Sequence, residues 1–151
     1  AMMRCATHSS DGKANLHQGA VGVGIDMGSG QSVCAVQHNR IVRQHPDTHI
    51  IFDKLTIPHW QQVLELASGC AGMAGLDYLG VDIVLDRLRG PMLLELNARP
   101  GLAIQVANQS GLQHRLLLAT KIADDCDDAE QKIRLARQQF TSQPGQPQAT
   151  F

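Results

Sequence analysis

The chain carries two kinds of hydrophobic periodicity, and each predicts a different element. Apolar residues alternate with small or polar residues over 21–27, 31–38 and 40–45, which is the period of a half-buried strand. Gly and Asn residues stand between these runs, as they do at tight turns. We therefore predict an antiparallel meander over residues 21–45, with a further short strand over 4–8.

A helical stripe follows Pro58, a residue that fits the first turn of a helix. The apolar members of the stripe are Trp60, Val63, Leu64, Ala67 and Ala71. We expect this helix to end near Gly72 and Gly75. A second helical region covers 102–118, either as one helix or as two helices that meet near Gly111.

The C-terminal part of the chain changes character. Residues 127–140 predict a last helix, because acids stand at its start and arginines near its end, as the helix dipole favours. Residues 141–151 are rich in Gln, Pro, Gly and Thr and predict a flexible tail. Residues 1–2 resemble a remnant of cloning. We thus expect one lobe over 3–120 and an additional C-terminal helix over 121–140.

Two further apolar runs, 80–86 and 91–97, predict a β-hairpin with its turn centred on residues 88 and 89. Residues opposite each other in a hairpin share a face, and alternate residues lie on opposite faces. This register predicts a polar face with Asp82 opposite Glu95, and the face consists of Asp82, Val84, Asp86, Leu93, Glu95 and Asn97. The apolar face consists of Val81, Ile83, Leu85, Met92, Leu94 and Leu96.

Opposed carboxylates destabilise a sheet unless a shared proton, solvent or a cation relieves their repulsion. Mg²⁺ prefers oxygen ligands and is typically held by one or two carboxylates together with substrate phosphates. Asp82, Glu95 and the side-chain oxygen of Asn97 offer three such ligands. Spacing alone leaves two interpretations open. The face is either a metal site for a phosphate-bearing substrate or the solvated side of a half-buried hairpin, and Asp86 lies nearer the turn.

Composition narrows the class of protein. The chain has 151 residues, 43% of them apolar, which suffices for a core and excludes a disordered chain. Aromatic residues make up only 3% and the formal net charge is −1, which argues against a nucleic-acid partner. The four cysteines form no C-x-x-C pair, as expected of reduced thiols. With no signal peptide and no long apolar run, we predict a cytoplasmic protein without a membrane partner.

Three other patterns indicate structural roles, and none of them predicts a binding or catalytic site. The glycines near the first strands have neither the dinucleotide-binding nor the P-loop spacing, and they are Gly22, Gly24, Gly28 and Gly30. His45 and His49 are four residues apart, but Pro46 interrupts any helix that would align them for zinc. Cys34 and Cys70 stand in apolar patterns and are expected in the core.

The stretch GVDIVLDRLRGPMLLELNARPGL, residues 80–102, resembles the metal-binding segment of ATP-grasp ligases. Those enzymes, D-alanine–D-alanine ligases included, carry an Asp on one strand and Glu-x-Asn followed by Pro-Gly on the next. The stretch SDGKANLHQGA, residues 10–20, is similar to a segment of glutamate ligases with Asn-Leu-His and a following Gly. The resemblance covers residues 4 to about 118. The group it points to is the alpha-L-glutamate ligase-like (RimK-type) ATP-grasp proteins.

This resemblance implies an α+β fold, the C-terminal lobe of an ATP-grasp fold with an antiparallel sheet and helices packed on one face. It implies ATP and Mg²⁺ as cofactors, with Mn²⁺ as the alternative metal. Asp82, Glu95 and Asn97 would be the metal ligands, with Glu95 bridging two ions. Arg99, Asn97 and Glu95 would bind the nucleotide. Arg99 stands where those ligases have a small polar residue and would add a phosphate contact.

The same resemblance implies Arg4, Lys13 and Asn15 as catalytic residues. Asn15 would lie near the phosphates or the acyl phosphate, and Arg4 and Lys13 would contact phosphate or carboxylate. Lys13 stands where the glutamate ligases have Arg, so the bidentate contact is lost there. Ala20 stands where a second Gly is usual. These departures leave the substrate open, and His17 fits either a substrate contact or a structural hydrogen bond.

The implied activity is that of a carbon–nitrogen ligase. ATP phosphorylates a carboxylate, and an amine then attacks the acyl phosphate, with an amino acid or peptide as substrates. An N-terminal ATP-grasp lobe would precede this chain, so the chain alone would be inactive and would expose a surface that favours a homo-oligomer. Two alternatives remain, a degenerate ATP-grasp module that binds a nucleotide or a partner without turnover, and an unrelated hydrolase with Asp82 and Glu95 as acid and base. The complete Asp-Glu-Asn set argues against the first, and the scarcity of aromatics against a glycosidase.

Overall fold

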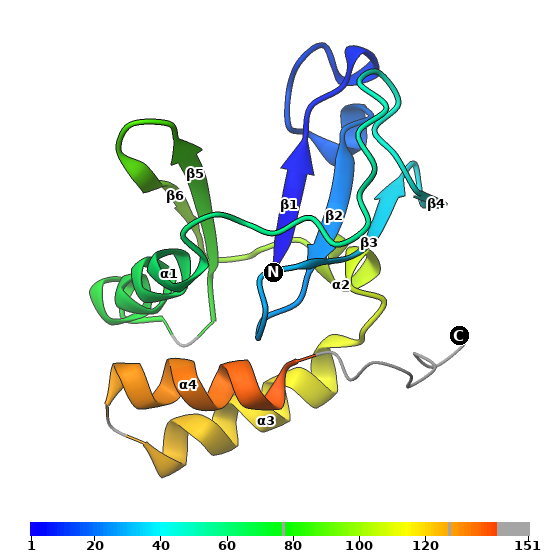
Figure 1. Cartoon of the computed structure of the whole chain (residues 1–151). Coiled ribbons are helices and arrows are strands. Elements are labelled where there is room, and N and C mark those ends of the chain that lie inside the picture. Colours follow the sequence, from blue (N-terminus) through cyan, green and yellow to red (C-terminus); the bar gives the residue numbers. More distant parts are fainter. Residues whose placement is uncertain (77, 127, 142–151) are drawn as a thin grey trace.

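The computed structural model of the chain describes residues 1–76, 78–126 and 128–141. Within them the chain forms a four-stranded antiparallel sheet, a separate β-hairpin and four α-helices (Figure 1). The predicted α+β class with antiparallel strands is confirmed, and the meander and the hairpin form two separate sheets. The predicted tail lies outside the described residues from position 142 onward.

The larger sheet confirms the predicted meander. Its strands are β1 (Met2–Cys5), β2 (Val21–Ile25), β3 (Ser32–Gln37) and β4 (Arg40–Val42), in the order β1-β2-β3-β4. The first strand begins and ends earlier than predicted, because Thr7 already caps the short 3₁₀-helix η1 (His8–Ser10). Met2 therefore belongs to the sheet, where it pairs with Gly24.

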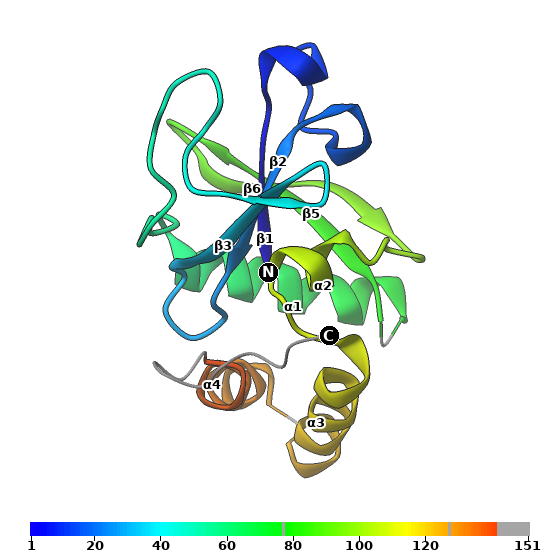
Figure 2. The same cartoon turned by 90° about the vertical axis from the view of Figure 1, so that its right-hand side faces the viewer.

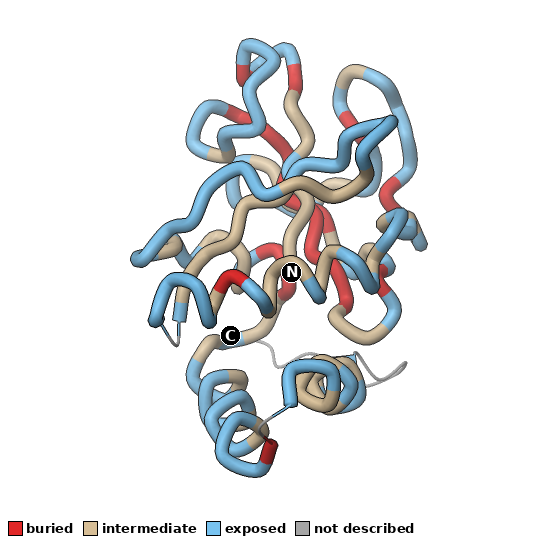
Figure 3. The backbone as a smooth tube through the Cα atoms, turned by 90° about the vertical axis from the view of Figure 1, so that its left-hand side faces the viewer, coloured by how far each residue is buried: buried red, intermediate tan, exposed pale blue. Residues whose placement is uncertain are grey.

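The alternation of β2 divides the sheet into two faces. Its Val and Ile side chains are buried in one cluster, which consists of Val21, Val23, Ile25, Ala35 and Phe52. Figure 3 shows the buried residues along the strands of this sheet, whereas the last two helices are mostly exposed or half-buried. Gly22 and Gly24 occupy the other face, and Arg4 points to the same side because it pairs with Gly22.

Helix α1 (Trp60–Ala74) packs against the hairpin of β5 (Gly80–Asp86) and β6 (Gly90–Asn97). Trp60 joins the edge of the core, and its Nε1 donates to the Met27 carbonyl at 3.0 Å. Helix α1 passes through Gly72 and ends only at Gly75, whose φ is +61°. The predicted end near Gly72 and Gly75 is confirmed at Gly75, and the helix passes through Gly72 because a single exposed Gly costs a helix only about 1 kcal/mol.

The register of the hairpin departs from the prediction near its turn. Asp86 pairs with Gly90, so the turn has three residues, 87–89, and is not centred on residues 88 and 89. Asp86 Oδ1 accepts hydrogen bonds from the Leu88 and Arg89 amides at 2.9 and 2.8 Å. These two donors hold the pKa of the Asp86 carboxyl below its usual range. The Asp86 carboxylate therefore stabilises the folded turn at pH values above the ordinary pKa of Asp. This stabilisation is lost as the pH falls through the lowered pKa of Asp86.

A bulge restores the predicted pairing at the other end of the hairpin. The register shifts between Asp82 and Ile83, so Leu94 is an extra residue on β6 and Asp82 still pairs with Glu95. Between bulge and turn the predicted faces were wrong. Leu93 pairs with Ile83 and lies on the apolar side, while Met92 pairs with Val84 on the other side.

The C-terminal region contains α2 (Ala103–Ala107), α3 (Leu112–Asp125) and α4 (Ala129–Gln139). The interpretation of residues 102–118 as two helices is confirmed, and Gly111 is the N-cap of α3. Helix α3 packs against α4, and both lie below the two sheets in Figures 1 and 2. Arg137 in α4 donates to the Gly28 carbonyl from two guanidinium nitrogens, at 3.0 and 2.7 Å, and thereby attaches α4 to the turn between β2 and β3.

Gly24 allows α2 to approach the sheet. A Cβ atom at this position would lie 2.8 Å from the carbonyl carbon of Ala107 and closer still to its oxygen. We expect Gly24→Ala to lower the free energy of unfolding by about 2 to 3 kcal/mol, because a backbone group would have to move. Urea denaturation measures this change in the free energy of unfolding. The matched change Gly69→Ala, at an exposed helical position with no atom within 4 Å of the added Cβ, should raise stability by about 0.5 to 1 kcal/mol, and equal effects would contradict the packing argument.

Candidate functional site

The structure places the three predicted metal ligands on one face of the hairpin. Asp82 pairs with Glu95 across β5 and β6, and Asn97 follows two residues along β6, opposite Gly80. Asp82 is half-buried, and Glu95 and Asn97 are exposed. The predicted juxtaposition of two carboxylates and an amide is therefore present in the fold. Their role as metal ligands stays a prediction.

An ion pair of Arg4 connects the larger sheet to the hairpin face that bears Asp82 and Glu95. Its Nη2 lies 2.8 Å from Asp82 Oδ2, and the two side chains are 38% and 32% exposed. The sequence predicted that Arg4 contacts an anion, but it gave no signal for this partner. The ion pair joins β1 to β5 and places a guanidinium directly beside the opposed carboxylates.

The segment 8–19 crosses the same side of the larger sheet. Leu16 covers Gly22, whose added Cβ would lie 3.2 Å from the Leu16 side chain. Asn15 caps the short 3₁₀-helix η2 (Leu16–Gln18), with its Oδ1 accepting from the His17 amide at 3.0 Å. Because Arg4 pairs with Gly22, this segment carries Asn15 to the side of the sheet that bears Arg4.

Lys13 and Arg99 are exposed at the surface. Lys13 Nζ lies 3.4 Å from Asp11 Oδ2, and both side chains are well solvated, at 62% and 90% exposure. The Arg99 amide donates to Asn97 Oδ1 at 2.9 Å. The Asn97 oxygen has a second lone pair, so this bond leaves it able to bind a cation. The structure thus places Asp82, Glu95, Asn97 and Arg4 together, with Lys13 bound to a carboxylate elsewhere.

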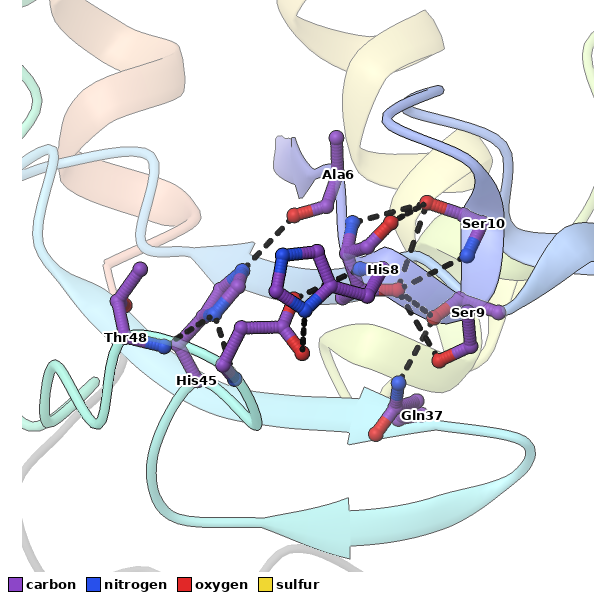
Figure 4. A network of polar contacts seen from close by, with 10 residues as sticks. Ala6, His8, Ser9, Ser10, Gln37, His45 and Thr48 are labelled. Carbon is purple, nitrogen blue, oxygen red and sulfur yellow. Dashed lines mark hydrogen bonds and ion pairs between the residues drawn. The ribbon is translucent and has the colours of Figure 1, made fainter.

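His45 anchors the base of segment 8–19. It is 8% exposed, and its Nε2 lies 2.8 Å from the Ala6 carbonyl oxygen (Figure 4). Its Nδ1 accepts from the amides of Asp47 and Thr48 at 3.2 Å each. Since Nδ1 accepts both bonds, Nε2 carries the proton and donates to Ala6. Both ring nitrogens are therefore used in holding two loops together.

Two further side chains close segment 8–19 where it returns to the sheet. Thr7 Oγ1 donates to the Gly19 carbonyl at 2.9 Å, and Gln37 Nε2 donates to the same oxygen at 2.7 Å. Ser10, which is 1% exposed, completes a capping box with Thr7. Sequence reasoning missed this network. The His-Pro-Asp-Thr turn at 45–48 and the Thr-x-x-Ser spacing at 7–10 are the local signals that could have found it.

The thiols of Cys5 and Cys34 show no sign of activation. Burial raises the pKa of Cys5 and is the main reason that the pKa of Cys34 is raised too, so both stay protonated at neutral pH. Cys70 is fully buried, as predicted, whereas Cys34 is only half-buried. Cys34 pairs with Gly24 and therefore lies on the face of the sheet opposite the core cluster, where its Sγ accepts from Gln109 Nε2 at 3.1 Å.

The side-chain oxygens on the hairpin face have the chemistry that a metal shared with a substrate requires. Within residues 1–76, 78–126 and 128–141, no group of three or more His, Cys, Asp and Glu side chains is gathered around one point. Two carboxylates and an amide oxygen do not make a complete protein cage, but Mg²⁺ needs no such cage when phosphate oxygens and water complete its octahedron. The ligand chemistry of Asp82, Glu95 and Asn97 therefore fits Mg²⁺ bound together with a nucleotide.

The family profile of sugar-transfer associated ATP-grasp proteins matches residues 1–121, most of the chain. The chain belongs to this ATP-grasp family. The match confirms the superfamily that residues 10–20 and 80–102 indicated, and the two sheets with their helices agree with an ATP-grasp lobe. No curated protein and no solved structure matches the chain significantly.

Membership of the ATP-grasp family supports binding of ATP and of a substrate, and ATP-dependent, ligase-like chemistry in general terms. The hairpin face lies inside the matched range, and so does segment 8–19. No helix among the described parts of this ATP-grasp chain has the length and apolar character needed to cross a membrane.

Proposed function

We propose that this chain is the C-terminal, Mg-ATP-binding half of an ATP-dependent carboxylate–amine ligase that works through an acyl phosphate. The observation that carries the proposal is the hairpin face, where Asp82 stands opposite Glu95, Asn97 follows, and Arg4 contacts Asp82. Membership of the ATP-grasp family indicates that the nucleotide is ATP. An oxygen-rich face such as this one can bind Mg²⁺ together with the phosphates of that nucleotide.

Each residue has a distinct task in this proposal. Asp82, Glu95 and Asn97 hold Mg²⁺, which when bound neutralises charge on the β- and γ-phosphate oxygens. Arg4 orients the transferred phosphoryl group or the substrate carboxylate through its planar fork. Lys13 supplies a mobile point charge, and Asn15 an amide beside the acyl phosphate. The reaction needs no side-chain nucleophile, in agreement with the protonated thiols.

The acid and the amine are amino acids or peptides if the glutamate-ligase resemblance holds in detail. The family description, sugar-transfer associated, adds sugar-bearing carboxylates and amines to the compounds to be tested. The replacement of Arg by Lys at position 13 favours a substrate that does not need a bidentate contact there.

We further propose that an N-terminal ATP-grasp lobe covers the nucleotide in the active protein. A triphosphate held by Asp82, Glu95 and Arg4 from one side stays exposed to water, which weakens each electrostatic contact and leaves an acyl phosphate open to hydrolysis. This chain alone should therefore bind Mg-ATP only at millimolar concentration, near −4 kcal/mol.

Calorimetric titration of this chain with Mg-ATP and an assay of ADP release with a panel of acids and amines test the proposal. We expect weak heats that disappear in Asp82→Asn, and ADP release only from a protein that carries both lobes. Micromolar binding with amine-dependent ADP release by this chain alone would show that it is a complete enzyme. Nucleotide binding without ADP release by the two-lobe protein, for every acid and amine tested, would favour the degenerate module.

A further inference from the structure

The contact between Arg4 and Asp82 places a protein cation where the proposed function places a metal. The guanidinium Nη2 lies 2.8 Å from Asp82 Oδ2, a distance typical of a charge-assisted hydrogen bond. Asp82 is also the residue directly opposite Glu95. Arg4 therefore offsets part of the repulsion between the two carboxylates when no metal is bound.

Arg4 is the cation best placed to do this. Among the ion pairs between described residues, the Arg4–Asp82 pair is the one that touches the hairpin face. Lys13 is paired with Asp11, and the Arg99 contact with Asn97 comes from its backbone amide. Asp82 is half-buried and Arg4 is 38% exposed, so solvent screens their attraction less than it would between two fully exposed side chains.

We propose that Arg4 is a resident counter-cation of Asp82, which Mg²⁺ displaces only when nucleotide phosphates arrive to receive the guanidinium. The proposal rests on the proposed function of this face and adds an order of binding to it. Metal alone would have to separate Arg4 from Asp82 and would then lie beside an unpaired positive charge. Metal with phosphate leaves Arg4 a new bidentate partner, because the guanidinium fork matches a phosphate group.

Two consequences follow for affinity. The face should bind a free divalent cation poorly, since Arg4 already holds one ligand. Metal and nucleotide should each strengthen the binding of the other, because the phosphate group compensates Arg4 for the loss of Asp82. Arg4 thus makes the site selective for the metal–nucleotide complex over the free ion.

The test measures Mn²⁺ binding to this chain by electron paramagnetic resonance, first with the metal alone and then with ATP present. We expect Arg4→Met to bind Mn²⁺ alone about two- to fivefold more tightly than the unaltered chain, a range set by the strength of partly exposed ion pairs. The gain should shrink at high salt. Arg4→Lys keeps the charge and should stay close to the unaltered chain. Far-UV circular dichroism verifies that each variant is folded.

Arg40→Met is the matched control, because Arg40 is an exposed strand arginine in β4, at the opposite edge of the sheet from β1. It removes the same charge and should leave Mn²⁺ binding unchanged. ATP should enhance Mn²⁺ binding less in Arg4→Met than in the unaltered chain. The enhancement should also be smaller in Arg4→Lys, because Lys lacks the planar guanidinium that binds phosphate through two hydrogen bonds.

The outcomes separate this inference from the proposed function. If Asp82→Asn weakens Mn²⁺ binding but Arg4→Met leaves it unchanged, the metal site stands and the role of Arg4 as counter-cation is wrong. If Asp82→Asn binds Mn²⁺ as well as the unaltered chain does, the metal site itself is misplaced and both proposals fail. If Arg40→Met raises the affinity for Mn²⁺ as much as Arg4→Met does, the effect is due to the change in net charge alone, and the inference is overturned.

Discussion

Glu95→Gln should reduce ATP-dependent turnover of the two-lobe protein by about 10²- to 10³-fold, the range expected when one transition-state charge contact is lost. The change keeps the size of the side chain and removes only the charge that would bridge the metal ions. In this chain without metal, the same change relieves the repulsion with Asp82, so the free energy of unfolding should be equal or higher.

Steady-state kinetics and urea denaturation measure the two effects of Glu95→Gln. Glu65→Gln is the matched control, since Glu65 is an exposed glutamate in α1 whose carboxylate accepts a hydrogen bond from Gln61 on the same helix. The two-lobe protein with Glu65→Gln should turn over ATP as fast as the unaltered protein. Full turnover in Glu95→Gln would remove Glu95 from the metal site, and a loss of stability would show that the carboxylate has a structural partner.

His45→Leu should lower the free energy of unfolding by about 3 kcal/mol, because three part-buried backbone groups lose their partner, at about 1 kcal/mol for each hydrogen bond. These are the Ala6 carbonyl and the amides of Asp47 and Thr48. Leucine fills a similar volume, so the loss reports hydrogen bonds and not a cavity. Segment 8–19 should also become more sensitive to protease, since His45 fixes the strand end from which it starts.

Urea denaturation and limited proteolysis of His45→Leu test this expectation. His114→Leu in α3 makes the same substitution at an exposed position and should change stability by no more than about 0.5 kcal/mol. A loss below about 1 kcal/mol in His45→Leu would mean that water reaches the three backbone groups and replaces the imidazole.

The sequence predicted the strands well, because their information is local. The Val-Gly-Val-Gly-Ile alternation of β2 assigns each residue to a face without reference to distant parts of the chain. The existence of the hairpin that carries Asp82 and Glu95 was also predictable, since a short turn connects its two apolar strands. The superfamily followed from two segments whose order and composition are specific.

The bulge at Leu94 was not predictable from the same pattern. The run Met92-Leu93-Leu94 is apolar throughout, so hydrophobicity does not tell which leucine faces the core. Gly90 carried the missing signal, because its φ of +74° is typical of the residue that closes a three-residue hairpin loop. The predicted pairing of Asp82 with Glu95 was correct because the extra residue at Leu94 compensates for the shifted turn.

The contacts between the sheets could not be predicted, since they join residues with no shared local pattern. Arg4 and Asp82 meet because the hairpin folds beside β1, and His45 meets Ala6 because the chain returns to the strand end after 39 positions. Such partners depend on how separate elements pack. The periodicity of each element fixes its faces but leaves its neighbours undetermined.

The attachment of Arg137 to Gly28 has a consequence for the synthesis of the protein. The turn between β2 and β3 leaves the ribosome early, but the guanidinium that fastens it follows 109 residues later. A nascent chain can pair β2 with β3 and can hold their connecting turn through Ile57 and Trp60, but the contact from Arg137 forms only after α4 emerges. The family match ends at residue 121, so a gene fragment cut at that boundary would encode the matched region without the clamp that completes its folding.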